Sequence, residues 1–382
     1  MVREMADQEE KKQSTIERFL RNNDAYLGLI LNSRFGRYYF FKRPKIKALY
    51  KKYLSEKDLR KKNRFCADIL NAYEKTFLWK FRYRREGVLE DLKLHSRYSR
   101  ERSIIDHSPK HHKDYYSVVM ILKNEARYIR EQILFYQATG ADRIYIYDND
   151  SDDDLLSVID PFLKSGLVIY RKWPGSKVQH SAYRDVIRRT KHHSKWLAIV
   201  DSDEFIFPVH GTMPENLKKY EAYPGVGVNW IVYGPNGHVD SPDGLVMDNY
   251  TATFEDRDSA INCHIKSIVQ PKEVVTVRHT HFPLYKRNRF AVDERGVALD
   301  NCYSYMPQAG RAFSEFNNHS VFRLNHYHSK SVEDLKRKCE RGYADGANNL
   351  PFEETLRSYD VPQIQDYAIK PFADIVREKM KG

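Results

Sequence analysis

The stretch that decides the fold is residues 116–147, YSVVMILKNEARYIREQILFYQATGADRIYIY. Its apolar run 116–122 is typical of a buried strand, and 143–147 has the same character. Between them, residues 125–138 have the apolar spacing of an amphipathic helix, which Gly140 ends. A strand, a helix and a strand with short joints predict a right-handed βαβ unit.

The same alternation continues beyond this unit. We expect helices at 154–163 and 181–191 and strands at 167–171 and 196–200. Strict alternation with short joints predicts an α/β fold with a mostly parallel sheet flanked by helices. Sheets of this kind bind their ligands at the carboxyl ends of the strands, so the residues that follow each strand are the candidates for chemistry.

Polar clusters follow three of the expected strands, at 123–125 (KNE), 148–151 (DNDS) and 201–204 (DSDE). The first stands where a glycine-rich phosphate loop would, which argues against a dinucleotide site or a P-loop. In an extended segment, Asp201 and Asp203 would point to one face and hold one hard divalent cation, which neutralises a diphosphate. The plainer interpretations are a helix N-cap for 123–125, a turn for 148–151 and a solvated strand end for 201–204.

The charge is unevenly distributed along the chain. Its 382 residues include 64 Lys and Arg against 52 Asp and Glu, a formal net charge of +12. Residues 1–113 hold 29 basic and 15 acidic side chains, a net of +14, which leaves −2 for residues 114–382. This asymmetry predicts two regions with different partners. The hydrophobic content of 41% excludes a wholly disordered chain.

We expect four regions: a basic, aromatic-rich helical region at 1–100, a linker at 101–114, the α/β domain at 115–350 and a C-terminal helical tail at 351–382. Between residues 34 and 83, 16 basic and four acidic side chains are interleaved with aromatic ones. Such a composition suits peripheral contact with an anionic membrane, or a structural layer whose charges are solvated. Nucleic acid is the least favoured partner.

The four cysteines, Cys66, Cys263, Cys302 and Cys339, are too few for a disulfide framework and lack the spacing of a zinc site. No apolar run approaches the roughly 20 residues of a membrane-spanning helix. The N-terminal stretch also lacks the apolar core of a signal peptide. We therefore expect a cytoplasmic protein with reduced thiols.

Five motifs resemble those of the metal-dependent GT-A glycosyltransferases grouped as glycosyltransferase family 92, and of their bacterial relatives. In chain order they lie at 116–153, 179–185 (QHSAYRD), 195–208 (KWLAIVDSDEFIFP), 229–238 (NWIVYGPNGH) and 325–345 (NHYHSKSVEDLKRKCERGYAD). The resemblance implies a GT-A fold, a UDP-sugar donor and a Mn²⁺ or Mg²⁺ ion. It covers residues 115 to about 345 and leaves out the basic region.

The resemblance also implies a metal site and a donor site. Asp201 and Asp203 would bind the metal, with His326 completing its shell and His328 as the alternate. The run 336–341 would meet the diphosphate. The donor-binding residues would be Lys123, Asn124, Glu125, Asp148, Asp150, Asp201 and Lys330.

On the acceptor side, the resemblance implies that Trp230 stacks on a sugar and that His238 hydrogen-bonds the acceptor. The plainer alternatives are a turn with a buried Trp and histidines that serve the core or the surface. Lys266, His279 and His281 recur in motifs similar to those of the family without an assigned role.

The expected function is metal-dependent glycosyl transfer, with inversion, to a glycan or lipid-linked glycan. Four carboxylates are candidates for the base, and the sequence does not choose between them: Asp240, Asp243, Glu255 and Asp256. The basic region and the lack of a signal suggest work at the inner face of a bacterial membrane, in lipopolysaccharide or capsule assembly. A sugar-phosphate nucleotidyltransferase and a nucleic-acid-binding protein are the alternatives; the first usually has a Gly-rich loop after the first strand, and the second leaves the polar clusters without a role.

Overall fold

The computed structural model describes residues 27, 42–74, 77–257, 259, 261–299, 312–314, 317–342, 351–359 and 361–381. The chain divides into two compact units. One comprises Met1–Arg85 with Ala298–Glu315, and the other comprises Glu86–Val297 with Phe316–Gly382.

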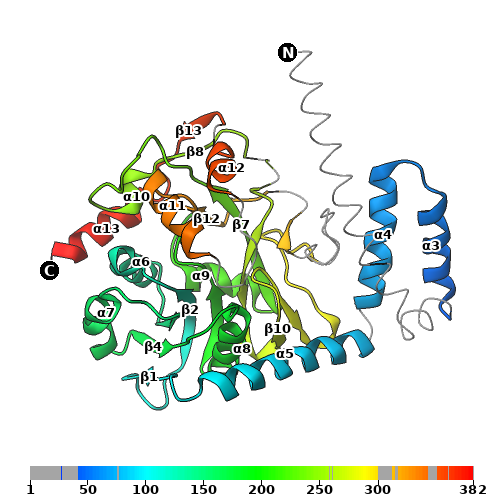
Figure 1. Ribbon diagram of the computed structural model, residues 1–382, viewed down its shortest axis with the longest axis horizontal. Coiled ribbons are helices and arrows are strands. Elements are labelled where there is room, and N and C mark those ends of the chain that lie inside the picture. The colour runs from blue at the N-terminus through cyan, green and yellow to red at the C-terminus, as the bar shows by residue number, and fades with distance from the viewer. Residues whose placement is uncertain are drawn as a thin grey trace. The chain divides into compact units, whose positions relative to one another are not determined.

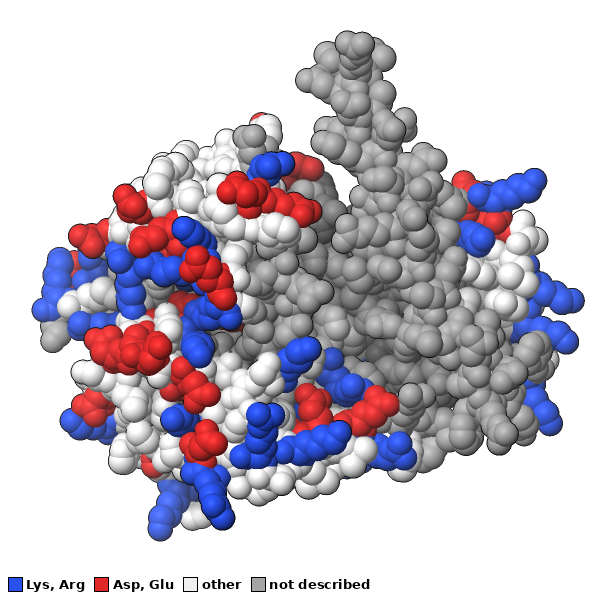
Figure 2. Space-filling model, in the orientation of Figure 1, with Lys and Arg blue, Asp and Glu red and all other residues white. Residues whose placement is uncertain are grey.

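The described core of the first unit is a pair of helices, α3 (Pro44–Ser55) and α4 (Leu59–Glu74). Pro44 stands at the first position of α3, where its missing N–H costs nothing. The helices enclose a small apolar core that includes Ile46, Cys66 and Ile69. The coloured side chains over α3 and α4 are mostly basic on the face that Figure 2 shows, whereas both signs are interspersed over the second unit.

The long helix α5 (Phe77–Tyr98) crosses the division between the units. The division falls at Arg85, ahead of the expected boundary at 100. The later turns of α5 belong to the second unit, because they make ion pairs with its other elements. Asp91 accepts hydrogen bonds of 3.0 and 2.8 Å from Arg184, and Glu86 pairs with Arg278.

The second unit is built on a nine-stranded sheet. In spatial order its strands are β1 (Ile104–Ile105), β4 (Val168–Lys172), β3 (Arg143–Asp148), β2 (Asp114–Leu122), β5 (Ser194–Ile199), β9 (Ile265–Val269), β7 (Gly225–Val232), β12 (Phe322–His326) and β6 (Glu204–Pro208). Strands β4, β3, β2 and β5 are mutually parallel, and β7 is parallel to β12. Strands β1, β9 and β6 run against their neighbours. The expected α/β class with a mostly parallel sheet is confirmed.

Helices cover both faces of this sheet (Figure 1). They are α6 (Ala126–Ala138), α7 (Leu155–Lys164), α8 (Gln179–Thr190), α9 (Met213–Leu217), α10 (Val246–Asn249), α11 (Val332–Arg341), α12 (Phe352–Arg357) and α13 (Lys370–Lys381). Two small strand pairs complete the unit, β10 (Val274–Val277) with β11 (Pro283–Tyr285) and β13 (Gln363–Gln365) with β8 (Ala252–Phe254). The elements expected between residues 116 and 200 are confirmed to within about two residues at each end.

Successive side chains of each strand point to opposite faces of the sheet. In β2, Val118 and Met120 belong to the large apolar core shared with α6, α7 and α13. On the opposite face, α8 is held by the hydroxyl of Tyr147, which donates a 2.8 Å hydrogen bond to Asp185. This packing fixes the carboxyl ends of the central strands at one edge of the sheet.

Two expected regions have more structure than the sequence suggested. The linker at 101–114 contains β1, which pairs with β4 and forms one edge of the sheet. The C-terminal tail contributes β13 as well as helices, and its last helix packs on α6, where the rings of Phe372 and Phe135 lie 5.6 Å apart. Within the described residues, no helix combines the length and apolarity that crossing a membrane requires.

Candidate active site

The acidic segment that follows β5 is a tight turn. The N–H of Glu204 donates to the carbonyl of Asp201 at 3.1 Å, and the Glu204 carboxylate accepts from the N–H of Asp201 at 2.8 Å. The expected extended geometry is therefore corrected: the chain turns here, and the side chains of Asp201 and Asp203 contact different residues.

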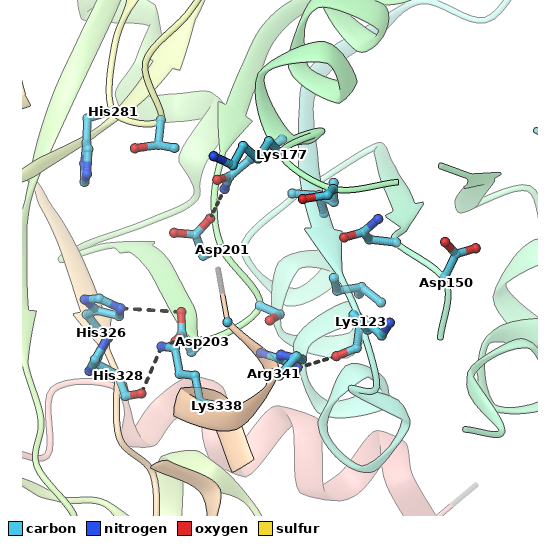
Figure 3. Close-up of a pocket in the computed structure, with 18 of the residues that line it drawn as sticks. Lys123, Asp150, Lys177, Asp201, Asp203, His281, His326, His328, Lys338 and Arg341 are labelled. Atoms are coloured by element: carbon cyan, nitrogen blue, oxygen red, sulfur yellow. Dashed lines mark hydrogen bonds and ion pairs between the residues drawn. The ribbon is translucent and has the colours of Figure 1, made fainter. Parts of the chain in front are cut away.

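The two oxygens of Asp203 have distinct surroundings. Oδ2 lies 2.5 Å from Nζ of Lys338, while Oδ1 lies 3.5 Å from Nε2 of His326 (Figure 3). Oδ1 is buried and accepts no hydrogen bond from the described residues. Burial alone would raise the pKa of this carboxyl, but Lys338 and His326 outweigh burial and hold the pKa of Asp203 well below its usual range.

Asp201 belongs to a buried ionic network. Nζ of Lys266, which is fully buried in β9, lies 2.6 Å from Asp201 and 3.5 Å from Glu204. Burial would lower the pKa of Lys266, but the two carboxylates reverse the effect and raise it. Gln179 and Tyr183 of α8 donate to the other oxygen of Asp201 at 3.0 and 3.3 Å. Asp201 is thus held by the protein itself.

These residues face a pocket of about 580 Å³ at the carboxyl edge of the sheet, a size that suits a small ligand. Four basic side chains line it: Lys123, Lys177, Lys338 and Arg341. In Figure 3, Lys123 and Asp150 lie on one side, His281 lies on the opposite side, and Asp201 and Asp203 lie between them. The basic side chains are spread around the pocket, and the side that holds His281 is its histidine side.

The histidine side is built around Trp230 of β7. The ring of His264 stacks on it at 4.7 Å, and the ring of His326 lies 4.3 Å away. Trp230 lines the pocket, as expected, but its ring is packed against histidines rather than offered to a sugar.

His281 is the histidine on the far wall of the pocket. Its Nδ1 lies 2.7 Å from the carbonyl of Ile265, and since a carbonyl only accepts, Nδ1 carries the hydrogen. Burial and the ammonium of Lys266 lower the pKa of His281 well below its usual value, so the ring is neutral near pH 7. Nε2 is then an unprotonated acceptor, and no described residue hydrogen-bonds it.

A divalent cation would be held by Asp203 and His326. Among the described residues, no three His, Cys, Asp or Glu side chains gather into a metal-binding group. Two ligands at about 2.1 Å from one cation stand about 3 Å apart when at right angles, close to the 3.5 Å between Oδ1 and Nε2 here. Burial lowers the pKa of His326, which keeps the ring neutral, the form that binds metal. The pair fits a cation whose other ligands come from water or substrate.

The structure brings six of the individually named residues to the pocket wall, together with the alternate His328 and with Lys338 and Arg341 of the expected run 336–341. The six are Lys123, Asp150, Asp201, Asp203, Trp230 and His326. They come from the ends of β2, β3, β5, β7 and β12, as the carboxyl-end rule predicts.

Four expected donor-binding residues do not line the pocket. Glu125 is buried in ion pairs with Lys330 at 3.4 Å and Arg341 at 3.0 Å. Asp148 accepts from the hydroxyl of Tyr170 and from a backbone N–H, and Asn124 accepts from the N–H of Asp152. These contacts brace the loops behind the pocket. The bond from the N–H of Ser151 to Asp148 agrees with the turn interpretation of the second cluster, whereas Glu125, at the N-cap of α6, makes no side-chain capping bond.

The acceptor-side expectations also differ from the structure. Asp240, Asp243, Glu255 and Asp256 are exposed and do not line the pocket. Asp243 lies 3.6 Å from Arg127, on the outer surface of the loop. His238 also lies outside the lining, where its Nε2 is 3.1 Å from the carbonyl of Asn249.

Sequence reasoning missed Gln179, Lys177 and the roles of Lys266 and His281. The signal for Lys266 was present, because a lysine within the apolar strand HIKSIV must be paired when buried. Gln179 opens the motif QHSAYRD, whose family likeness was noted without a role. Lys177 has no pattern around it that marks it, and only its φ of 58° in the loop before α8 distinguishes it.

Curated relatives carry the same family name as the sequence resemblance. A glycosyltransferase family 92 protein of Oryza sativa subsp. japonica is 32% identical over 197 residues, covering 49% of this chain and 33% of that protein. One of Arabidopsis thaliana is 31% identical over 205 residues, covering 49% and 35%. The match thus spans about a third of the length of each of these relatives.

Solved structures resemble the chain at low similarity. Residues 1–349 of TarS from S. aureus share 13% identity, over 64% of this chain and 70% of that one, with a TM-score of 0.29. GalNAc-T7, solved with UDP, GalNAc and Mn²⁺, shares 9% identity over 70% and 57%, with a TM-score of 0.28. No conclusion about the pocket rests on likenesses this low.

The family model supplies the decisive match. The model of glycosyltransferase family 92 matches residues 116–345, more than half of the chain, and this range contains most of β2, the strands β3 to β12, the acidic turn and the pocket residues described above. The resemblance carried by the five motifs is confirmed, and the chain belongs to glycosyltransferase family 92.

Proposed function

We propose that this chain is a metal-dependent glycosyltransferase that moves a sugar from a UDP-sugar to a hydroxyl of a glycan or lipid-linked glycan, with inversion. The observation that carries the proposal is the pair Asp203 and His326, which face each other 3.5 Å apart beside Lys338 in a basic pocket. Family membership supports sugar transfer as the reaction class.

Asp203 and His326 would hold Mn²⁺ or Mg²⁺ through Oδ1 and Nε2. When bound, the cation would offset the negative charge that develops on the diphosphate leaving group. Lys338 and Arg341 would donate to the phosphate oxygens from the last turns of α11. Since Lys338 is already 2.5 Å from Asp203, its ammonium is held at the point where the phosphates would arrive.

The two sides of the pocket would hold the two parts of the donor. Lys123 and Asp150 would contact the nucleoside, because they lie on the side of the pocket away from His281 (Figure 3). The sugar would then lie toward Trp230 and His281. This arrangement orients the anomeric carbon toward the histidine wall, where an acceptor would enter.

His281 would act as the base, in place of the four carboxylates that lie outside the pocket. The acceptor oxygen forms its bond to the anomeric carbon while the bond from that carbon to the phosphate oxygen breaks, and the electron pair leaves with UDP. The acceptor proton would pass to Nε2 of His281, which the hydrogen bond from Nδ1 to Ile265 orients.

The acceptor, the site of action in the cell and contact with an anionic membrane stay predictions. The basic helices α3 and α4 support peripheral membrane contact. The relatives reported above are plant proteins, so the bacterial setting, including lipopolysaccharide or capsule assembly, rests on the charge distribution alone. Co-sedimentation with vesicles containing phosphatidylserine should fall steeply between 50 and 300 mM salt, because the Debye length shortens from about 14 Å to about 6 Å over this range.

A donor screen tests the proposal. UDP-, GDP- and CMP-sugars are titrated calorimetrically with and without Mn²⁺, and nucleotide release with a panel of glycan acceptors is followed by mass spectrometry. We expect UDP-sugars to bind only with the metal and one of them to yield a product one sugar heavier. Binding of none of the nucleotide sugars would overturn the assignment.

A further inference from the structure

A second pocket, of about 560 Å³, lies between α5, the end of β4 and α8. In Figure 1, α5 runs past α8 along one side of the second unit. The lining of this second pocket shares no residue with the candidate active site. The charged part of this lining consists of Asp91, Arg102, Arg171, Asp185, Arg188 and Arg189, together with His95.

The arginines of this pocket exceed its carboxylates. Asp185 is shared by Arg171 at 3.2 Å, Arg188 at 3.3 Å and Arg189 at 2.8 Å. Asp91 lies 3.0 Å from Arg188 and also forms an ion pair with Arg184, which does not line the pocket. Four guanidinium groups thus face two carboxylates, so the pocket holds two positive charges that no lining carboxylate offsets.

Arg102 is the least satisfied of the four. Its guanidinium carbon lies 3.5 Å from the centre of the Trp173 ring, which the flat group covers. Nε and Nη2 are buried without a hydrogen-bond partner among the described residues. Burial lowers the pKa of Arg102, but an arginine keeps its charge and its donors. Unpaired buried donors are costly, so these N–H groups call for an acceptor that the described part of the chain does not supply.

The mouth of the pocket is apolar. Val88 and Leu92 stand one turn apart on α5 and are 50% and 59% exposed. An occupant that meets both features has a doubly charged anionic head and an apolar part beside it. A phosphate or diphosphate group matches the head, because its several oxygens accept from guanidinium forks at both charges.

We propose that this pocket binds the phosphate or diphosphate group of a phosphorylated ligand through Arg102, Arg188 and Arg189, with Val88 and Leu92 contacting an apolar part of that ligand. The group can belong to a soluble compound or to a lipid headgroup. The inference stands apart from the proposed sugar transfer, because it uses neither the residues nor the chemistry of the other pocket.

The test is calorimetric titration of the full chain with inorganic pyrophosphate in the absence of metal. Arg102→Gln should weaken binding at least tenfold. The control Arg377→Gln, which removes an exposed, ion-paired arginine on α13, should leave it unchanged. The comparison of Arg102 with Gln is repeated in a Lys338→Gln background, in which the diphosphate partner of the other pocket is removed. Binding that survives Arg102→Gln, or that is lost only in Lys338→Gln, would overturn the proposal.

A folding control separates ligand binding from structure. Because Nε and Nη2 of Arg102 hydrogen-bond no described residue, Arg102→Gln gives up mainly the stacking on Trp173 and should lower the melting temperature only slightly. Arg189→Gln, at a side chain 43% exposed, serves as a second variant and should also weaken pyrophosphate binding.

A vesicle arm identifies the source of the phosphate. Phosphatidylcholine vesicles with and without phosphatidic acid are compared for co-sedimentation of the wild-type chain and Arg102→Gln. If Arg102→Gln reduces co-sedimentation with the vesicles that contain phosphatidic acid but not with the others, the site binds a lipid headgroup. If Arg102→Gln weakens pyrophosphate binding but leaves co-sedimentation unchanged, the site binds a soluble ligand. If neither probe binds in an Arg102-dependent way, the site does not exist.

Discussion

The ammonium nitrogen of Lys338 lies 2.5 Å from Oδ2 of Asp203. The same carboxylate presents its other oxygen, buried and without a hydrogen bond from the described residues, toward His326. The carboxylate of Asp203 is therefore shared between the ammonium of Lys338 on α11 and the imidazole of His326 on β12. This arrangement would let Asp203 release Lys338 to the phosphates and bind the cation when a metal-bound diphosphate enters the pocket.

Replacing Lys338 tests this exchange. Lys338→Gln should weaken UDP binding at least tenfold, because one phosphate partner is lost, yet strengthen binding of Mn²⁺ alone, because nothing then competes for Asp203. Mn²⁺ titration followed by electron paramagnetic resonance measures the second effect. Lys336→Gln, on an exposed position of the same helix, is the matched control. An unchanged Mn²⁺ affinity in Lys338→Gln would contradict the exchange.

His281 should affect chemistry more than binding. His281→Gln should lower kcat by about 10²- to 10⁴-fold, the usual range for general base catalysis, with the Kd for UDP changed less than threefold. Because burial lowers the pKa of His281, the wild-type rate should stay flat as the pH falls from 8 to 6.5. His238→Gln, outside the pocket, should keep near wild-type turnover. Equal losses in both variants would remove His281 from the reaction.

Lys266 should matter for stability. Lys266→Met leaves the carboxylates of Asp201 and Glu204 without their cation, and breaking a buried pair in this way costs about 3–5 kcal/mol. Urea unfolding measures the loss. Adding Glu204→Gln should recover part of it, because burial already raises the pKa of Glu204 and favours a neutral side chain there. A loss below about 1 kcal/mol would show that the network is dispensable.

The second unit should lose stability in mild acid. Burial lowers the pKa of His180 and His264 to about 4 and that of His279 to about 3. The unfolded chain binds protons at these groups below pH 6.5 while the folded one does not, so stability falls as the pH decreases from 6.5 toward 4. Urea midpoints at pH 7.5, 6 and 5 should decrease in that order, and less so in His279→Gln. Midpoints independent of pH would contradict this burial.

The central βαβ pattern could be predicted from the sequence, because a seven-residue apolar strand such as 116–122 leaves few other ways to bury its side chains. The turn at Asp201 could not. It depends on the side chain of Glu204 closing back on a backbone N–H, and an acidic run after a strand reads equally well as extended chain. Asp203 and His326 of the proposed metal site were thus named from the sequence, but the partners of Asp201 were not.

The proposed base, His281, could not be predicted for a related reason. Asp240 and Asp243 follow the motif NWIVYGPNGH closely in sequence, yet the direction of their loop is set by distant contacts. Arg127 of α6 donates to the carbonyl of Ser241 at 2.9 Å and draws the loop outward. His281 comes from a different part of the chain, and only the fold brings it opposite Asp203.

The most direct measurement is calorimetric titration of UDP into the wild-type chain and Asp203→Asn, each with and without Mn²⁺. Asn keeps the size of Asp203 but removes the charge that both His326 and Lys338 meet. The account predicts binding to the wild-type chain that weakens at least tenfold without Mn²⁺, and no effect of Mn²⁺ on Asp203→Asn. Equal affinity in all four titrations would contradict a metal-assisted site at Asp203.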